Sequence, residues 1–182
     1  VEFSRGIKGH LRVVANASAI AEHLPADLAA FAKAQPGIRV SLEELTSADV
    51  QSAVAEGRAD VGIFIAPAVE PSLDCRPYRE GELAILVPLG HTLAHSLPRQ
   101  PGHGFDALLD FDIVGLHAGA AAHEQMLQRA QALGRPLKAR MQVHGFDAIA
   151  QLVEAGLGVA VLPAVVAHRF AQVFRVQPLV LQ

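Results

Sequence analysis

The sequence predicts an α/β protein of two lobes, each a mostly parallel β-sheet flanked by helices. Segments with the apolar pattern of strands alternate with segments of helical spacing along most of the 182 residues. Two stretches that contain proline and glycine, residues 88–94 and 98–104, interrupt this alternation and indicate a boundary between the lobes. Hydrophobic residues make up 51% of the chain, which is enough to form a core in each lobe.

The first half of the chain has the order strand, helix, strand, helix, strand. Its first strand is a short apolar run, and its second alternates apolar and polar residues, the period of a half-buried strand. The first helix stops at Pro36 and Gly37, and the second at Gly57, a residue type common at helix ends. This order gives two right-handed crossovers and therefore a parallel sheet. The expected strands are residues 11–15, 38–45 and 60–65, and the helices contain residues 24–31 and 50–54.

The second half continues this alternation without repeating the sequence of the first. Gly134 and Gly156 end two of its helices, and Pro163 stops a strand. Two strands are expected before the interruption, at residues 73–78 and 83–87. After it, strands are expected at residues 113–116, 139–143, 159–162 and 176–181, and helices contain residues 126–133, 149–153 and about 164–171.

Composition excludes several classes of partner. The net charge is −3, the isoelectric point is about 6.3, and Lys and Arg are scattered, so this chain is not built to hold nucleic acid. No apolar run approaches the length that crosses a membrane, and no secretory signal is visible. The single cysteine, Cys75, cannot form a disulfide within the chain, which favours a reducing compartment. We therefore expect a cytoplasmic protein that does not contact a membrane.

Small and hydroxyl-bearing residues follow three of the predicted strands, each just before a helix. Unpaired N–H groups at a helix N-terminus favour an anion or a carbonyl oxygen, and small side chains leave room for it. Because ligands of parallel sheets bind at the carboxyl ends of the strands, we expect these turns to line a cleft. Taken alone, each of Ser18, Thr46 and Ser47 is better explained as an ordinary N-cap, and only the three turns together favour a ligand cleft. Asp49 would oppose a fully anionic ligand if it points inward. The turns contain Asn16, Ala17, Ser18 and Ala19; Thr46 and Ser47; and His117, Ala118, Gly119 and Ala120.

Catalytic and metal-binding interpretations are weaker. No G-x-S-x-G motif surrounds Ser18. His91 and His95 have i, i+4 spacing but lack the glutamate of H-E-x-x-H. His117 and His123 lack a third residue that would complete a metal site. We therefore expect no catalytic residue, no cofactor and no metal ion. The residues interpreted as structural are His144, His168 and Cys75.

Five short motifs occur in a fixed order along the chain. Each is weak alone, but their order and spacing are specific. They are R-G-I-K-G-H-L-R-V at residues 5–13; the L-P, F and Q-P-G-I positions within residues 24–38; E-G-R-A-D-V-G-I at 56–63; L-V-P-L-G-H-T-L-A at 86–94; and L-V-E-A-G-L-G-V-A-V-L-P at 152–163. Together they resemble the effector-binding domain of LysR-type transcriptional regulators over almost the whole chain. Thr92 departs from the pattern, because the family usually has proline there.

The resemblance implies a periplasmic-binding-protein-like fold of two lobes. Residues 1–87 and 163–182 would form the first lobe, and residues 88–162 the second. Such domains bind a small metabolite between the lobes without altering it, and pass the event to an N-terminal winged helix-turn-helix, which is absent from these residues. The protein would be a homodimer or tetramer, and it would contact DNA only through that N-terminal domain.

The resemblance also assigns residues to these roles. Ser18 and Ser47 fall where the family places hydroxyl groups that contact the effector, and His117 and Phe146 fall on the facing side of the second lobe. The implied ligand-binding residues are Asn16, Ala17, Ser18, Ala19, Thr46, Ser47, Ile65, Leu116, His117, Ala118, Gly119 and Phe146. The implied dimer interface contains Leu24, Leu28, Phe31, Met126 and Ala130, although a core role would explain the same residues.

Three functions agree with these features. The first is a ligand-sensing regulatory domain whose effector is a small carboxylate or a similar polar metabolite. The alternative is an extracytoplasmic solute-binding protein of a transport system, and the third is a small enzyme of the same two-lobed class. An upstream helix-turn-helix favours regulation, an upstream signal peptide favours transport, and turnover of a bound metabolite favours an enzyme.

Overall fold

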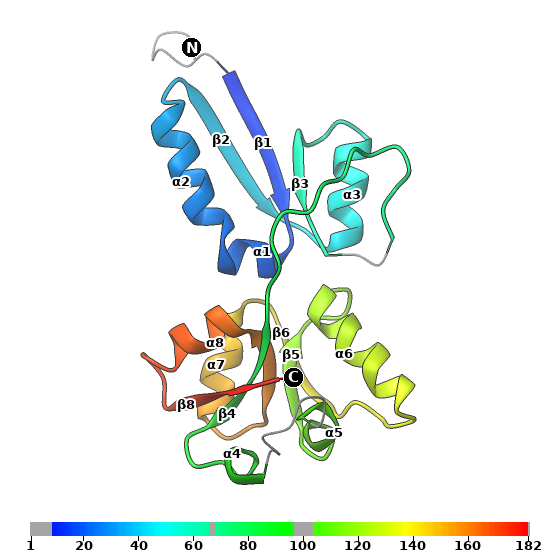
Figure 1. Cartoon of the computed structure of the whole chain (residues 1–182), viewed down its shortest axis with the longest axis vertical. Coiled ribbons are helices and arrows are strands. Elements are labelled where there is room, and N and C mark those ends of the chain that lie inside the picture. The colour runs from blue at the N-terminus through cyan, green and yellow to red at the C-terminus, as the bar shows by residue number, and fades with distance from the viewer. Residues whose placement is uncertain (1–8, 66–67, 97–103, 182) are drawn as a thin grey trace. The chain divides into compact units, whose positions relative to one another are not determined.

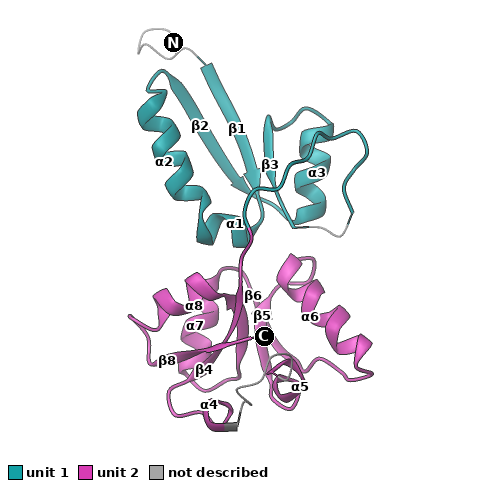
Figure 2. Ribbon diagram, viewed as in Figure 1, with its two compact units in different colours: residues 1–79 teal, residues 80–182 magenta. Residues whose placement is uncertain are grey.

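The computed structural model of the chain describes residues 9–65, 68–96 and 104–181. Its strands and helices fall into two units, Val1–Arg79 and Glu80–Gln182 (Figure 2). The first unit contains β1 (Gly9–Ala15), α1 (Ala17–Glu22), α2 (Leu24–Ala34), β2 (Ile38–Glu44), α3 (Ser47–Ala55) and β3 (Val61–Ile63). The second contains β4 (Leu83–Pro88), α4 (Leu93–Ser96), α5 (Gly104–Leu108), β5 (Ile113–Leu116), α6 (Ala121–Ala132), β6 (Ala139–Val143), α7 (Phe146–Glu154), β7 (Ala160–Pro163), α8 (Ala164–Phe170) and β8 (Val176–Val180) (Figure 1).

The first unit is a parallel sheet, as the sequence predicted, and its strand order is β2-β1-β3. Successive residues of its central strand point to opposite faces, and each face has its own core. Val13 and Ala15 pack with Leu24 of α2 on one face, whereas Val14 packs with Val50 of α3 on the other. The parallel arrangement places the carboxyl ends of all three strands at one edge of the sheet.

A glycine allows α3 to lie close to this sheet. A Cβ atom on Gly62 of β3 would stand 2.7 Å from Val50 Cγ1 and 2.9 Å from Val54 Cγ2, closer than side-chain atoms approach one another. The missing side chain therefore sets the distance between the strand and the helix.

The second unit is mixed. Its strand β4 lies between β7 and β8 and is antiparallel to both, while β5 and β6 form a parallel pair. A bridge between Ile113 and Val159 connects the two groups of strands. The core contains residues from β4, α4, α5, β5, α6 and β7 and from the segments next to them. It includes Ile85, Val87, Leu93, Phe105, Leu108, Leu109, Ile113, Met126, Ala130, Val159 and Val161.

The division into units differs from the lobes expected from the resemblance. In the expected division, residues 80–87 and 163–182 belong to the first lobe. In the structure β4 is the central strand of the second unit, and β8 pairs with it from Ala84↔Val180 to Pro88↔Val176. Strand pairing, which the pattern of one strand does not reveal, therefore assigns both segments to the second unit.

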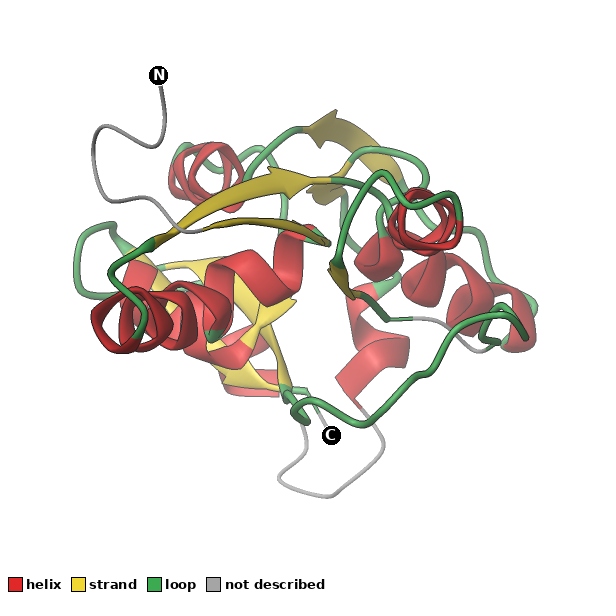
Figure 3. Cartoon of the chain, turned by 90° about the horizontal axis from the view of Figure 1, so that it is seen from above, coloured by secondary structure: helices red, strands yellow, loops and turns green. Residues whose placement is uncertain are grey.

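Most predicted elements are present, with four differences. Residues 73–78 form no strand, because all but Leu73 are exposed and Pro77 cannot donate to a ladder. The short helices α1, α4 and α5 were not predicted, since four to six residues are too few to show helical periodicity. Figure 3 shows the helices and strands along the chain in separate colours. Within the described residues, none of the helices is long and apolar enough to cross a membrane.

Candidate functional site

Backbone hydrogen bonds gather three strand ends at the carboxyl edge of the first unit's sheet. The N–H of Asn16 donates to the carbonyl of Ile63 at 3.0 Å, which joins the end of β1 to the end of β3. The N–H of Leu45 donates to the carbonyl of Ala15 at 3.0 Å, which joins β2 to β1. The turns that carry the predicted ligand residues of this unit are therefore neighbours.

The side chains of two of these residues cap the N-termini of helices. The Asn16 side-chain oxygen accepts from the N–H of Ala19 at 3.1 Å and caps α1. The Thr46 hydroxyl accepts from the N–H of Asp49 at 3.2 Å and donates to the Asp49 carboxylate at 2.7 Å, so it caps α3. The N-cap explanation is thus confirmed for Thr46, whereas the cap of α1 is Asn16 and not Ser18, and Ser47 lies inside α3. The Asp49 carboxylate, whose charge we expected to oppose an anion, accepts a hydrogen bond from the cap of its own helix.

Ser18 and Ser47 differ from the caps. They lie inside the first turns of α1 and α3 and are 7% and 9% exposed. The Ser47 hydroxyl accepts from the N–H of Ile65 at 3.2 Å, which ties the segment after β3 to α3. Because a hydroxyl has both a donor and acceptor positions, Ser47 retains a proton that it can donate. Ile65 itself is 45% exposed.

Two histidines lie at the corresponding edge of the parallel pair in the second unit. Leu116 of β5 pairs with Val143 of β6, and His117 and His144 follow them directly. The N–H of His117 donates to the carbonyl of Val143 at 3.1 Å, and the two imidazole rings are 4.4 Å apart at an angle of 31°. We interpreted His144 as a structural residue from the sequence. His117 and His144 lie close together because each directly follows one of two neighbouring parallel strands, and the sequence shows only that each follows a strand.

The His117 ring is oriented by its own turn. Its Nδ1 lies 2.9 Å from the carbonyl oxygen of Ala118, which can only accept, so Nδ1 carries the proton of this contact. Nε2 is then an acceptor when the ring is neutral. The turn therefore fixes which nitrogen of the neutral imidazole, Nε2, can accept a hydrogen bond.

The backbone of that turn is largely occupied, contrary to our expectation of unpaired N–H groups. The N–H of Gly119, a residue with φ 89°, donates to the Glu124 carboxylate at 3.1 Å. The N–H of Ala120 donates to the carbonyl of His117 at 3.1 Å. Glu124 from the first turn of α6 thus fills the position that the sequence suggested for a ligand anion. Side chains, not amides, are the principal polar groups here.

Two of the other predicted ligand residues of the second unit are almost fully buried. Leu116 is 4% exposed and Phe146, the first residue of α7, is 6% exposed, so each offers a ligand little surface. Ala118 is exposed. His123 is buried at 7%, with its ring nitrogens 3.3 and 3.5 Å from the Gln142 side-chain nitrogen.

Core packing accounts for most of the residues assigned to a dimer interface. Met126 and Ala130 are 3% and 0% exposed and belong to the second unit's core, so they cannot supply surface to a partner. Leu24 is 4% exposed within the first unit's core, and Leu28 packs against it. Phe31 is partly exposed. For Met126, Ala130 and Leu24 the core explanation replaces the interface.

His91 precedes α4 and His95 lies on it. His91 accepts through Nδ1 from the N–H of Leu93 at 3.2 Å, and its ring packs edge-on against Phe111 at 4.8 Å. Burial lowers the pKa of His91. His95 is exposed on α4. Within the part of the chain that the structure describes, no group of three or more His, Cys, Asp or Glu side chains could hold a metal ion.

Comparison with known proteins identifies the family of this chain. Residues 4–182 match the profile of the LysR substrate binding domain. The probable HTH-type transcriptional regulator LrrA of Synechococcus elongatus is 29% identical over 168 residues, which are 92% of this chain and 55% of that protein. A probable RuBisCO transcriptional regulator of Synechocystis is 25% identical over 143 residues, which are 75% of this chain and 40% of that protein. The chain spans about half the length of these curated relatives.

Solved structures show the same fold. The BenM effector binding domain with its effector benzoate has a TM-score of 0.78 at 20% identity, covering 96% of this chain and 78% of that one. The Synechocystis CcmR regulatory domain in complex with 2-PG has a TM-score of 0.73 at 20% identity, covering 94% and 80%. The predicted periplasmic-binding-protein-like fold is thereby confirmed.

Proposed function

Because the chain belongs to the LysR substrate binding domain family, we propose that it is the effector-sensing part of a bacterial transcription regulator. The regulators among its relatives favour this function over the solute-binding alternative. The effector is a small polar metabolite, such as a carboxylate, which the chain binds and leaves chemically unchanged.

The observation that carries this proposal is the pair of nearly buried serines at one edge of a parallel sheet. Ser18 and Ser47 follow neighbouring strands, and the hydroxyl of Ser47 has a proton to donate. A carboxylate or carbonyl oxygen of the effector accepts from these groups, in the position where parallel sheets bind ligands. The remaining residues that we assign to this part of the site are Asn16, Ala17, Ala19, Thr46 and Ile65.

In the second unit, we assign effector contacts to the turn that follows β5. His117 offers an imidazole nitrogen that accepts from a hydroxyl when neutral, and His144 lies beside it. A metabolite that carries a hydroxyl group suits this imidazole. The remaining residues that we assign here are Leu116, Ala118, Gly119 and Phe146.

The proposed mechanism is a shift in the population of conformations. The effector can shift the equilibrium between conformations only as far as it binds one arrangement of the two units more tightly than another. A tenfold preference corresponds to about 1.4 kcal/mol. The favoured arrangement changes the geometry of a homodimer or tetramer.

We place DNA recognition in an N-terminal winged helix-turn-helix of the complete protein, in the cytoplasm. The name of the LrrA relative and the net charge of −3 on this chain support that assignment. The full-length BenM structures, of which the chain covers 56–57%, have the same fold over the matching part.

The first test combines a ligand screen with matched serine variants. A set of small carboxylates and hydroxy acids is screened by thermal shift, because a binder of the folded chain raises its melting temperature. Ser18→Ala and Ser47→Ala are expected to weaken the best binder at least about tenfold, since each removes a hydrogen bond to a charged group. The measurement is the Kd by calorimetry.

The control is Ser52→Ala in the same helix as Ser47. The Ser52 hydroxyl is exposed and donates to the carbonyl of Ala48 at 3.2 Å, so its loss leaves affinity unchanged. Wild-type affinity in both the Ser18 and Ser47 variants contradicts the proposed site.

A further inference from the structure

The chain passes from the first unit to the second through a long segment without helix or strand, residues 68–82 in the described part (Figure 1). One attachment to the first unit is early in this segment. The N–H of Glu70 donates to the side-chain oxygen of Gln51 in α3 at 2.8 Å. A second attachment lies at its end, where the unit stops at Arg79.

This second attachment is a cluster around Asp27 of α2. The Arg79 guanidinium donates to both carboxylate oxygens of Asp27 at 3.0 Å, and the Tyr78 hydroxyl also donates to that carboxylate. The guanidinium lies over the Tyr78 ring, 5.5 Å from its centre. One carboxylate on a helix therefore holds two consecutive residues of the segment. We name Asp27, Tyr78 and Arg79 the hinge clamp.

The next attachment belongs to the second unit and follows after only two residues. The N–H of Ala164 donates to the carbonyl of Glu82 at 2.8 Å, and Leu83 then pairs with Pro163. Between the clamp and Glu82 lie Glu80 and Gly81, for which the described residues show no hydrogen bond to either unit. Gly81 has no side chain to restrict its backbone.

We propose that Glu80 and Gly81 form the hinge of this chain and that the hinge clamp keeps it two residues long. Without the clamp, the nearest hydrogen bond to a helix or strand of the first unit among the described residues is that of Glu70, and about eleven residues become free. A flexible segment spans a distance that grows as the square root of its length, so the spread of positions widens roughly twofold. The proposal concerns the chain itself. Its consequence for effector affinity rests on the proposed function, because a wider set of arrangements must be ordered on binding.

Electron paramagnetic resonance distances between spin labels test the hinge without any ligand. The labels are placed at Ser52→Cys in α3 and Gln128→Cys in α6, both exposed, in a Cys75→Ser background because Cys75 is an exposed thiol. Asp27→Ala is expected to broaden the distance distribution between the units roughly twofold. The matched control is Arg76→Ala. Arg76 pairs with Asp74 within the same segment, at 84% and 80% exposure, and this pair connects to no helix or strand.

A second pair of labels separates a loosened hinge from an unfolded unit. Lys33→Cys and Ser52→Cys both lie in the first unit, so their distance distribution stays narrow if that unit remains folded. If Asp27→Ala broadens this internal distance, the double variant Tyr78→Phe with Arg79→Ala replaces it, because it leaves α2 intact. Equal distributions between the units in the clamp variant and in Arg76→Ala, with the first unit folded, overturn the proposal.

Discussion

At the scale of single residues, similar polar side chains have different tasks that depend on one position along the helix. Asn16 and Thr46 precede their helices and cap them, whereas Ser18 and Ser47 lie within the first turns and are the residues that we propose for the effector. The sequence predicted all four as candidates, because cap and ligand residues share the same chemistry. The structure distinguishes them through the partner of each oxygen.

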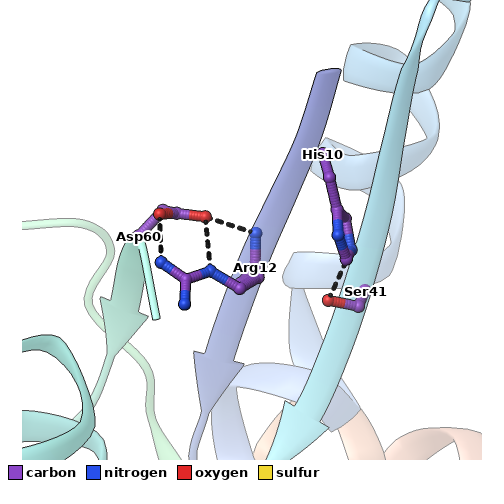
Figure 4. Close-up of polar contacts among 4 residues, drawn as sticks. All are labelled: His10, Arg12, Ser41 and Asp60. Carbon is purple, nitrogen blue, oxygen red and sulfur yellow. Dashed lines mark hydrogen bonds and ion pairs between the residues drawn. The ribbon is translucent and has the colours of Figure 1, made fainter. Parts of the chain in front are cut away.

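A residue-scale prediction concerns Arg12 of β1 and Asp60, which directly precedes β3 (Figure 4). The Asp60 carboxylate accepts from the guanidinium at 2.8 and 3.2 Å and from the backbone N–H of Arg12 at 2.8 Å, beside a contact between His10 and Ser41. These hydrogen bonds lower the pKa of Asp60 from 3.8 to about 2. The folded pKa is below the unfolded one, so the stabilisation is complete above pH 3.8 and is lost as pH falls towards 2.

Asp60→Asn is therefore expected to be less stable than the wild type at neutral pH, with a difference that shrinks from about pH 4 downward. Urea unfolding at a series of pH values measures this. Asp74→Asn serves as the control, because its ion pair with Arg76 is almost fully exposed. A stability difference for Asp60→Asn that stays constant from pH 7 to pH 2 would show that the charge of the carboxylate contributes nothing to the free energy of unfolding.

At the scale of elements, the sequence predicted the strands and helices that are long enough to show their periodicity. The alternation in residues 38–45 and the glycine after residue 56 were sufficient for β2 and for the end of α3. The partners of β4 were not predictable, since its run of apolar residues indicates burial on both faces but not which strands cover its edges. The same limit concealed the proximity of His117 and His144, which depends on β5 and β6 being neighbours.

An element-scale prediction concerns the packing of α3 on β3. Gly62→Ala places a methyl group within 3 Å of two valine side chains, and these belong to a packed core that cannot move aside freely. We expect a loss of about 1–3 kcal/mol in the free energy of unfolding. The matched control is Gly9→Ala in β1, where nothing lies within 4 Å of the added atom. Equal stability of the two variants in urea would mean that Gly62 does not set this distance.

At the scale of the whole chain, the residues that we assign to effector binding lie more than fifty positions apart in sequence and belong to different units. Hydrogen exchange in the presence of the compound with the largest thermal shift tests whether they respond to the same compound. If one molecule contacts both units, amides near Ser18, Ser47 and His117 gain protection together, because a bound ligand reduces local opening. His117→Ala is expected to reduce the protection at all three positions, since it weakens the same complex. Protection confined to the first unit, unchanged in His117→Ala, would assign the effector to that unit alone and leave the imidazole pair without a role in binding. In that case the coupling between the units would depend on the hinge clamp, since its residue Asp27 lies on α2 of the unit that binds the effector. The distances between the spin labels would then change on addition of effector even though the second unit does not contact it.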